Sequence, residues 1–140
     1  MSGLDQLLRL QKWTLDEKRR QARDLEALIE KLHHDIAELD REVLREIAAA
    51  QHSLELQRVL PGYRKIMQER RERIEASIAN LREELQRLQD QIAEAFSELK
   101  KTEQAIESRK QRQRLQERRR EQIVSDELGI DLHRRRQSQE

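Results

Sequence analysis

Apolar residues recur along this chain at alternating spacings of three and four, the pattern of a coiled-coil helix. The pattern forms two runs of heptad a and d positions, and we call these positions the seam. Apolar residues occupy 11 of the 14 positions in the first run and 10 of the 12 in the second. The first run comprises Leu4, Leu8, Gln11, Leu15, Lys18, Ala22, Leu25, Ile29, Leu32, Ile36, Leu39, Val43, Glu46 and Ala50; the second comprises Met67, Arg71, Ile74, Ile78, Leu81, Leu85, Leu88, Ile92, Ala95, Leu99, Thr102 and Ile106. A stripe this narrow predicts two long helices that pack on each other.

One segment, Val59-Leu60-Pro61-Gly62-Tyr63, interrupts the pattern. Inside a helix Pro is unfavourable by ~3 kcal/mol and Gly by ~1 kcal/mol relative to Ala. We therefore predict a single all-α domain over residues 1–140, folded as a long antiparallel two-helix coiled-coil hairpin. Its helices are expected at about 3–55 and 64–125, with a turn at about 56–63 and a basic C-terminal tail at about 126–140.

The pairing of the two helices can be tested by folding the chain about Gly62. Each a residue then falls on a d residue, Val43 meets Leu81 and Asp40 comes near Arg82. The heptad phase also continues through the turn, so two chains could instead align as a parallel dimer. We expect the monomeric hairpin, because the Pro-Gly pair disfavours a continuous helix and two halves of one chain have a high effective concentration.

The composition excludes most globular classes. Charged residues make up 41% of the 140 residues, aromatic residues 2%, and there are 3 Gly, 1 Pro and no Cys. Disulfides and thiol nucleophiles are therefore excluded, and too few large apolar residues exist for a thick core. No run approaches the ~20 apolar residues of a membrane span. Because Asp5 and Arg9 interrupt the first apolar stretch, we expect no signal peptide and a cytoplasmic protein.

Candidate catalytic and metal-binding groups are scarce. His33 and His34 are adjacent, so they point ~100° apart on a helix. His52 and His133 have no partner at metal-ligand spacing. Neither a Gly-rich phosphate loop nor a nucleophile–base pair occurs. We therefore expect no enzymatic activity, cofactor, metal or small-molecule substrate.

Charge is unevenly distributed along the chain. The net charge is +1, but residues 109–140 carry 10 basic and 6 acidic groups, a local net of +4, which indicates an acidic partner at this end. The runs Arg118–Arg120 and Arg134–Arg136 could contact nucleic acid. Acidic residues are interleaved with them and no aromatic stacking platform is present, so we do not expect a nucleic-acid partner.

Two apolar clusters lie off the seam, where a coiled coil usually binds partners. The first comprises Leu7, Leu10 and Trp13, which the register about Gly62 places near residues 111–117, with Arg118, Arg119, Arg120, Ile123 and Val124 just beyond. The second lies at the predicted turn and comprises Leu54, Leu56, Val59, Leu60, Tyr63 and Ile66, of which Leu56, Val59, Leu60 and Tyr63 are the candidate contact residues. Either cluster could cover local structure or dock a partner, and both interpretations stay open.

Specific runs resemble the flagellar export protein FliJ family. The opening Leu4-x-x-Leu-Leu-Arg-Leu-x-Lys-Trp-x-Leu-Asp-Glu-Lys-Arg-Arg20 is similar to the start of that family, and its Trp13–Arg20 part is the most specific. The similarity continues at Pro61-Gly-Tyr63, Glu94-Ala-Phe-Ser-Glu-Leu-Lys-Lys101 and Glu117-Arg-Arg-Arg-Glu121. The family tail runs directly from its arginine cluster into a Leu-Asp-Glu-like step, whereas Val124-Ser125 precedes Asp126-Glu127 here.

The resemblance implies a non-enzymatic, stalk-like hairpin in the bacterial flagellar type III protein export apparatus, peripheral at the cytoplasmic face of the inner membrane. It implies that Leu7, Leu10, Trp13, Arg118, Arg119, Arg120, Ile123 and Val124 face the hexameric export ATPase. It also implies that Leu56, Val59, Leu60 and Tyr63 face the membrane export gate, and it allows export chaperones as further partners. A related injectisome rod fits equally well, and a dimeric structural or nucleic-acid-associated coiled coil is the alternative.

Overall fold

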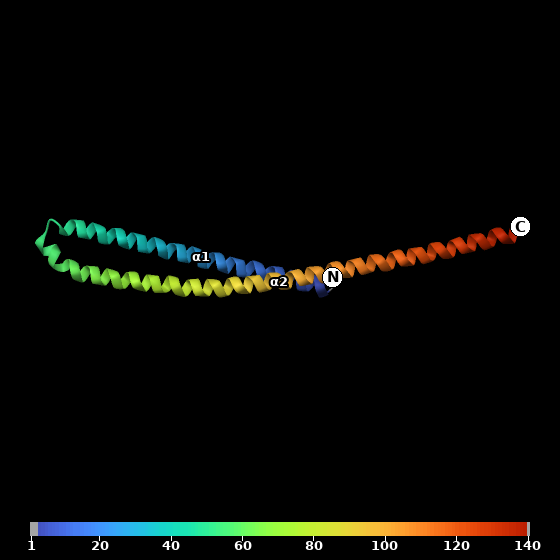
Figure 1. The fold of residues 1–140 in the computed structure, drawn as a ribbon, viewed down its shortest axis with the longest axis horizontal. Coiled ribbons are helices and arrows are strands. Elements are labelled where there is room, and N and C mark those ends of the chain that lie inside the picture. The colour runs from blue at the N-terminus through green and yellow to red at the C-terminus, as the bar shows by residue number, and fades with distance from the viewer. Residues whose placement is uncertain (1–2, 140) are drawn as a thin grey trace. The chain divides into compact units, whose positions relative to one another are not determined.

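The computed structural model describes residues 3–139, which form two long helices and one short turn. Helix α1 spans Gly3–Ala50 and helix α2 spans Leu54–Gln139. The helices pack against each other, and no strand occurs within residues 3–139 (Figure 1). The predicted all-α fold, a two-helix hairpin, is therefore confirmed.

The chain divides into two compact units that both helices enter. The hairpin unit, Trp13–Phe96, holds most of α1, the turn and the first half of α2. The terminal unit combines Met1–Lys12 with Ser97–Glu140, so it contains the start of α1 and the remainder of α2.

Burial in the hairpin unit confirms the predicted seam. The buried side chains of this unit are Leu15, Ala22, Leu39, Ala50, Met67, Ile78 and Leu88. All are a or d residues, and the other assigned seam residues of the unit are half-buried except Glu46. Since burying a large aliphatic side chain contributes roughly 1.5–3 kcal/mol, this single apolar layer supplies most of the stability of the hairpin.

The turn lies at residues 51–53, so its predicted position at about 56–63 is wrong. Ser53 is the reason, because its side chain caps α2. Its Oγ accepts a hydrogen bond from the backbone N–H of Leu56 at 3.3 Å, and its carbonyl accepts one from the N–H of Gln57 at 3.1 Å. A Ser cap stabilises a helix start by ~1 kcal/mol, which favours this position for the turn.

Helix α2 continues through Pro61 and Gly62. Pro61 is only the eighth residue of α2 and lacks the N–H that would donate to the carbonyl of Gln57. In Figure 1 the first, green turns of α2 run across the end of the hairpin unit before the helix continues alongside α1. Proline is a usual cause of a helix bend, because its ring and its missing hydrogen bond disturb the preceding turn.

The register of the hairpin unit differs from the one predicted about Gly62. Val43 lines the same groove as Met67, two heptads before the predicted partner Leu81. Asp40 pairs with Arg71, whereas Arg82 contacts His33, with Nη2 and Nε2 3.0 Å apart. Both registers place a residues on d residues, so the periodicity could not distinguish them. The earlier turn selects the observed one.

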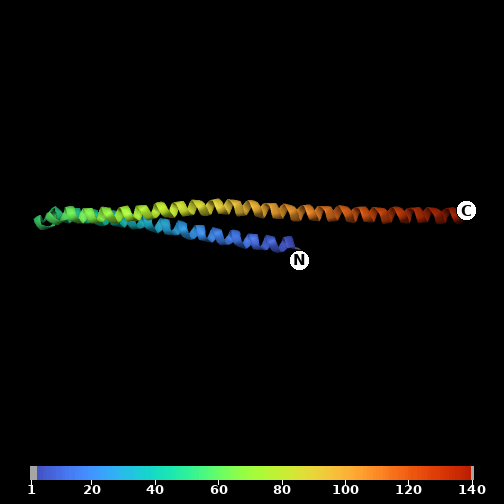
Figure 2. The same ribbon diagram turned by 90° about the horizontal axis from the view of Figure 1, so that it is seen from below.

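In the terminal unit, the start of α1 has half-buried side chains at Leu4, Leu8 and Gln11, and burial along α2 ends before residue 107. Leu99 and Thr102 are buried, Glu103 and Ile106 are half-buried, and every described side chain from 107 to 139 is exposed. Within this unit, Figures 1 and 2 show the orange-to-red part of α2 continuing past the blue start of α1. The predicted helix end at about 125 and the separate tail are therefore wrong. The helix persists because residues 126–139 contain no Pro and only one Gly.

Candidate functional site

The N-terminal apolar cluster points outward, as its heptad positions predicted. In the terminal unit Leu7 is 42% and Leu10 59% exposed. In the hairpin unit Trp13 is 64% exposed and is the only Trp of the chain. An indole this exposed contributes little to folding, whereas burying it against a partner would be favourable.

The arginine-rich part of the predicted site is also exposed, but the structure does not bring it to the start of α1. The group Arg118, Arg119, Arg120, Ile123 and Val124 lies on the part of α2 where every side chain is exposed. Half-buried side chains of the terminal unit end at Ile106, so Leu7 and Leu10 do not lie near residues 111–117. The expected juxtaposition fails because the turn comes earlier, which leaves the last part of α2 uncovered.

The second predicted cluster lies near the turn and divides into two kinds of residue. Leu56 and Val59 are exposed, at 40% and 62%, whereas Leu60 and Tyr63 are half-buried. Leu54, which follows the Ser53 cap directly, is the most exposed large apolar side chain of the region. The outer face of the turn therefore offers apolar surface to a partner, while Leu60 and Tyr63 also serve the hairpin itself.

Tyr63 has an unusual electrostatic environment for a surface hairpin. Its hydroxyl oxygen is buried and has no hydrogen-bond partner among residues 3–139. Burial raises the pKa of Tyr63 above its ordinary value, and the carboxylates of Glu42 and Glu46 raise it further. Arg45 and Arg70 act in the opposite direction. The surroundings of the phenol therefore disfavour its ionised form.

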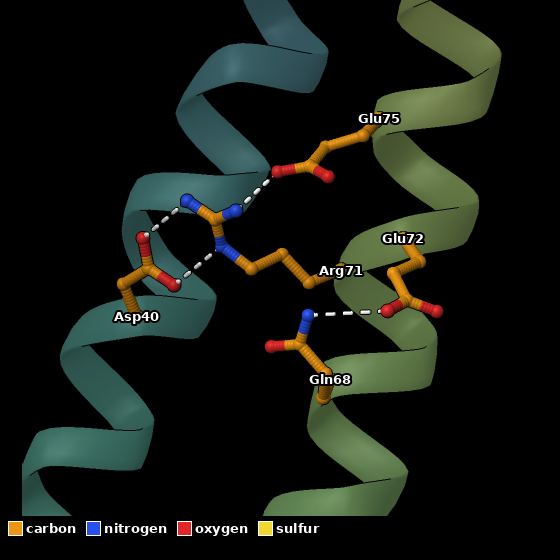
Figure 3. Close-up of polar contacts among 5 residues, drawn as sticks. All are labelled: Asp40, Gln68, Arg71, Glu72 and Glu75. Carbon is orange, nitrogen blue, oxygen red and sulfur yellow. Dashed lines mark hydrogen bonds and ion pairs between the residues drawn. The ribbon is translucent and has the colours of Figure 1, made fainter.

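Arg71 forms a polar contact across the seam that sequence reasoning did not predict (Figure 3). Its Nε and Nη2 donate to Oδ1 and Oδ2 of Asp40 at 3.1 and 3.3 Å, and it also pairs with Glu75 on its own helix. The hydrogen bond and charge of Asp40, together with the charge of Glu75, raise the pKa of Arg71. Beside this group, Gln68 donates to Glu72 at 3.3 Å. In the sequence, the only indication of this contact was an Arg at a heptad a position. Such a residue needs a carboxylate partner, but the sequence does not identify which one.

The grooves of the hairpin unit are shallow channels between the helices. One is lined by Leu25, Leu28 and Leu88 together with charged and amide side chains. Among residues 3–139, no group of three His, Asp or Glu side chains could hold a metal ion. Neither described helix is long and apolar enough to cross a membrane.

Comparison with protein families, curated proteins and solved structures yields no match to this chain.

Proposed function

We propose that this chain is a non-enzymatic, stalk-like component of a bacterial flagellar type III export apparatus that binds and stimulates the hexameric export ATPase. The observation that carries this proposal is the run Trp13-x-Leu-Asp-Glu-Lys-Arg-Arg20, which resembles the FliJ family. In the hairpin unit Leu15 of this run is buried in the seam, while Trp13 is exposed. The run therefore combines a residue that packs the hairpin with an aromatic side chain available to a partner.

Two surfaces support contact with the ATPase. Trp13 supplies an exposed aromatic side chain, and aromatic and Arg residues dominate binding energy in protein interfaces. The uncovered part of α2 supplies Arg118, Arg119 and Arg120, followed by Ile123 and Val124. Stimulation requires no chemistry from this chain, because contact can favour one arrangement of a ring over another.

The turn region is the proposed contact with the membrane export gate. Leu54, Leu56 and Val59 form an exposed apolar surface beside the half-buried pair Leu60 and Tyr63. A two-helix seam resists bending better than one helix does, so it suits the transmission of a conformational change. The protein would then act at the cytoplasmic face of the inner membrane.

The test is stimulation of the export ATPase of the same organism, measured as phosphate release with purified proteins. We expect Trp13→Ala to weaken binding or stimulation at least tenfold, as loss of ~1.4 kcal/mol implies, while helicity and melting stay nearly unchanged. The combined Arg118→Glu, Arg119→Glu and Arg120→Glu variant should act likewise and flatten the salt dependence. Leu44→Ala is the matched control, because Leu44 is also on α1 and 65% exposed.

Two results would contradict this function. The first is normal stimulation of the ATPase by both Trp13→Ala and the triple Arg variant, which would show that these residues do not bind the ATPase. A loss of stimulation in Leu44→Ala as large as that in Trp13→Ala would show that the effect is not specific to the predicted contact.

A further inference from the structure

Part of the uncovered stretch of α2, which runs from residue 107 to 139, is strongly basic. Residues 109–120 contain seven basic side chains and one acidic side chain, a net charge of +6. The seven are Arg109, Lys110, Arg112, Arg114, Arg118, Arg119 and Arg120. All are exposed, and none forms an ion pair or a side-chain hydrogen bond with another described residue. We call residues 109–120 the basic segment.

The basic side chains form two rows on opposite sides of the helix. At ~100° per residue, Lys110, Arg114 and Arg118 make one row. Arg109, Arg112, Arg119 and Arg120 make the other, centred about 170° away around the axis. A flat anionic surface could contact only one row. Two rows on opposite sides fit a groove bordered by anions on both sides.

The two faces between the rows differ in charge, and this difference would determine which face of the helix points into the groove. One face carries Gln111 and Leu115, an amide and an apolar group with no charge. The opposite face carries Gln113 and Glu117, which is the only acidic residue of the basic segment. Within residues 109–120 the negative charge therefore lies on the side that would point out of such a groove. Glu107 and Glu121 flank the row of Lys110, Arg114 and Arg118 at its two ends.

The composition of the basic segment favours duplex nucleic acid over an acidic protein or a single strand as its anionic partner. Protein interfaces are centred on buried apolar and aromatic anchors, but this segment has only one apolar side chain, Leu115. Protein–DNA interfaces are more polar and far more positively charged. Single-stranded nucleic acid is bound through aromatic stacking, and residues 109–120 contain no aromatic residue.

We propose that the basic segment binds double-stranded DNA by lying in the major groove, with one basic row on each phosphate backbone. A helix is ~10–12 Å across with its side chains, and the major groove of B-form DNA is ~12 Å wide. The major groove of duplex RNA is too deep and narrow for this mode. The unfavourable expectation from the sequence weighed Arg118–Arg120 and Arg134–Arg136 with their neighbouring acids. In the structure the exposed part of α2 runs from residue 107 to 139, and within it residues 109–120 contain a single acidic side chain. The proposal does not rest on the export function.

Repulsion within the basic segment supports an anionic occupant. Lys110, Arg114 and Arg118 follow one another at four-residue spacing, and like charges at this spacing destabilise a helix. Phosphates along the row would remove that repulsion. The helicity of the full-length protein should therefore increase when duplex DNA is added.

The test is binding of the full-length protein to a fluorescein-labelled 20-base-pair DNA duplex, followed by anisotropy at several salt concentrations. With five to seven phosphate contacts, a plot of the logarithm of affinity against the logarithm of salt concentration should have a slope of about −4.5 to −6.3. The single strand of the same length should bind at least fivefold more weakly. Poly-glutamate of equal charge should not compete at equal charge concentration.

A triple variant locates the site without changing the residues assigned to the ATPase. Lys110→Gln, Arg112→Gln and Arg114→Gln together should weaken duplex binding at least tenfold and reduce the slope by about 3, since each lost contact removes ~0.9. The control, Arg23→Gln, Arg41→Gln and Arg73→Gln, removes the same charge from exposed positions of the hairpin unit and should change affinity less than twofold.

Three outcomes would overturn the proposal. The first is equal loss of affinity in the two triple variants, which would indicate non-specific attraction. The second is competition by poly-glutamate as effective as that by the duplex, which would indicate an acidic protein partner. The third is equal affinity for single and double strands.

Discussion

Arg71 on α2 binds Asp40 on α1 through two parallel hydrogen bonds, Nε to Oδ1 at 3.1 Å and Nη2 to Oδ2 at 3.3 Å. Arg71 occupies an a position, where the seam otherwise carries apolar side chains, and it is half-buried. The paired geometry requires these two residues to lie at the same level of the hairpin unit. The contact therefore favours the observed register over any register displaced by a heptad.

Asp40→Asn should lower the unfolding midpoint of the hairpin, because Arg71 keeps only Glu75 as a charged partner. The effect should be smaller than that of a buried seam truncation, since the Asp40 side chain is 48% exposed and solvent screens the pair. In about 1 M salt, where the Debye length is ~3 Å, the difference from the native chain should shrink. The control is Asp24→Asn, which also removes one negative charge, at an exposed position of α1. An equal shift of the unfolding midpoint in both variants would contradict a specific role for the Arg71–Asp40 pair.

Leu39→Ala should destabilise the hairpin by ~2–5 kcal/mol, because it removes a buried side chain from the seam. Leu39 is 6% exposed, whereas Leu44 on the same helix is 65% exposed. Leu44→Ala should therefore change the free energy of unfolding by no more than ~0.5 kcal/mol. Chemical denaturation followed by circular dichroism measures both, and similar values for the two variants would invalidate the seam assignment.

Lys18→Leu should stabilise the hairpin by ~1 kcal/mol, because it replaces a charged d residue with an apolar one. Lys18 is half-buried, and its Nζ donates to Oε1 of Gln91 at 2.9 Å. This exposed hydrogen bond contributes less than apolar burial at that layer. Lys31→Leu, at an exposed position, is the control, and it should produce no comparable rise in the thermal midpoint.

Ser53→Ala should destabilise the hairpin by ~1 kcal/mol, because the N–H of Leu56 loses its acceptor. Ser53→Asp should retain most of the stability, since Asp is an equally good cap and is favourable at a helix N-terminus. The measurement is the thermal midpoint of the three proteins. Equal midpoints for Ser53→Ala and the native chain would show that the cap does not position the turn.

Stability should fall as pH rises above about 10, and Tyr63 should account for part of the fall. The unfolded chain loses the phenolic proton near that pH, while burial and the nearby carboxylates hold it to a higher pH in the folded chain. The unfolded state then binds fewer protons, so the free energy of unfolding decreases with pH. Tyr63→Phe should show a shallower decrease.

Absorbance titration gives a direct check, because Tyr63 is the only Tyr of the chain. The ionisation should occur at higher pH in the folded protein than in denaturant. An unshifted titration would show that the hydroxyl is solvated in solution.

Part of the candidate site could be predicted because it depends on single-helix geometry. The phase of the heptads places Leu10 and Trp13 off the seam, and both are exposed. The partner of Arg71 could not be predicted, since several carboxylates of α1 were available and the choice depends on the register. The separation of Arg118–Arg120 from Leu7 and Leu10 was missed for the same reason.

The sequence by itself determined which residues form the seam and that the chain is helical, because heptad spacing is a property of one helix and its side-chain directions. Which heptad of α2 faces which heptad of α1 is a relation between two helices, and every shift by seven residues preserves the match of a with d. Only the tertiary structure decided that relation in the hairpin unit. The cap at Ser53 and the pairing of Arg71 with Asp40 favour one register, while α2 continues through Pro61 near its start.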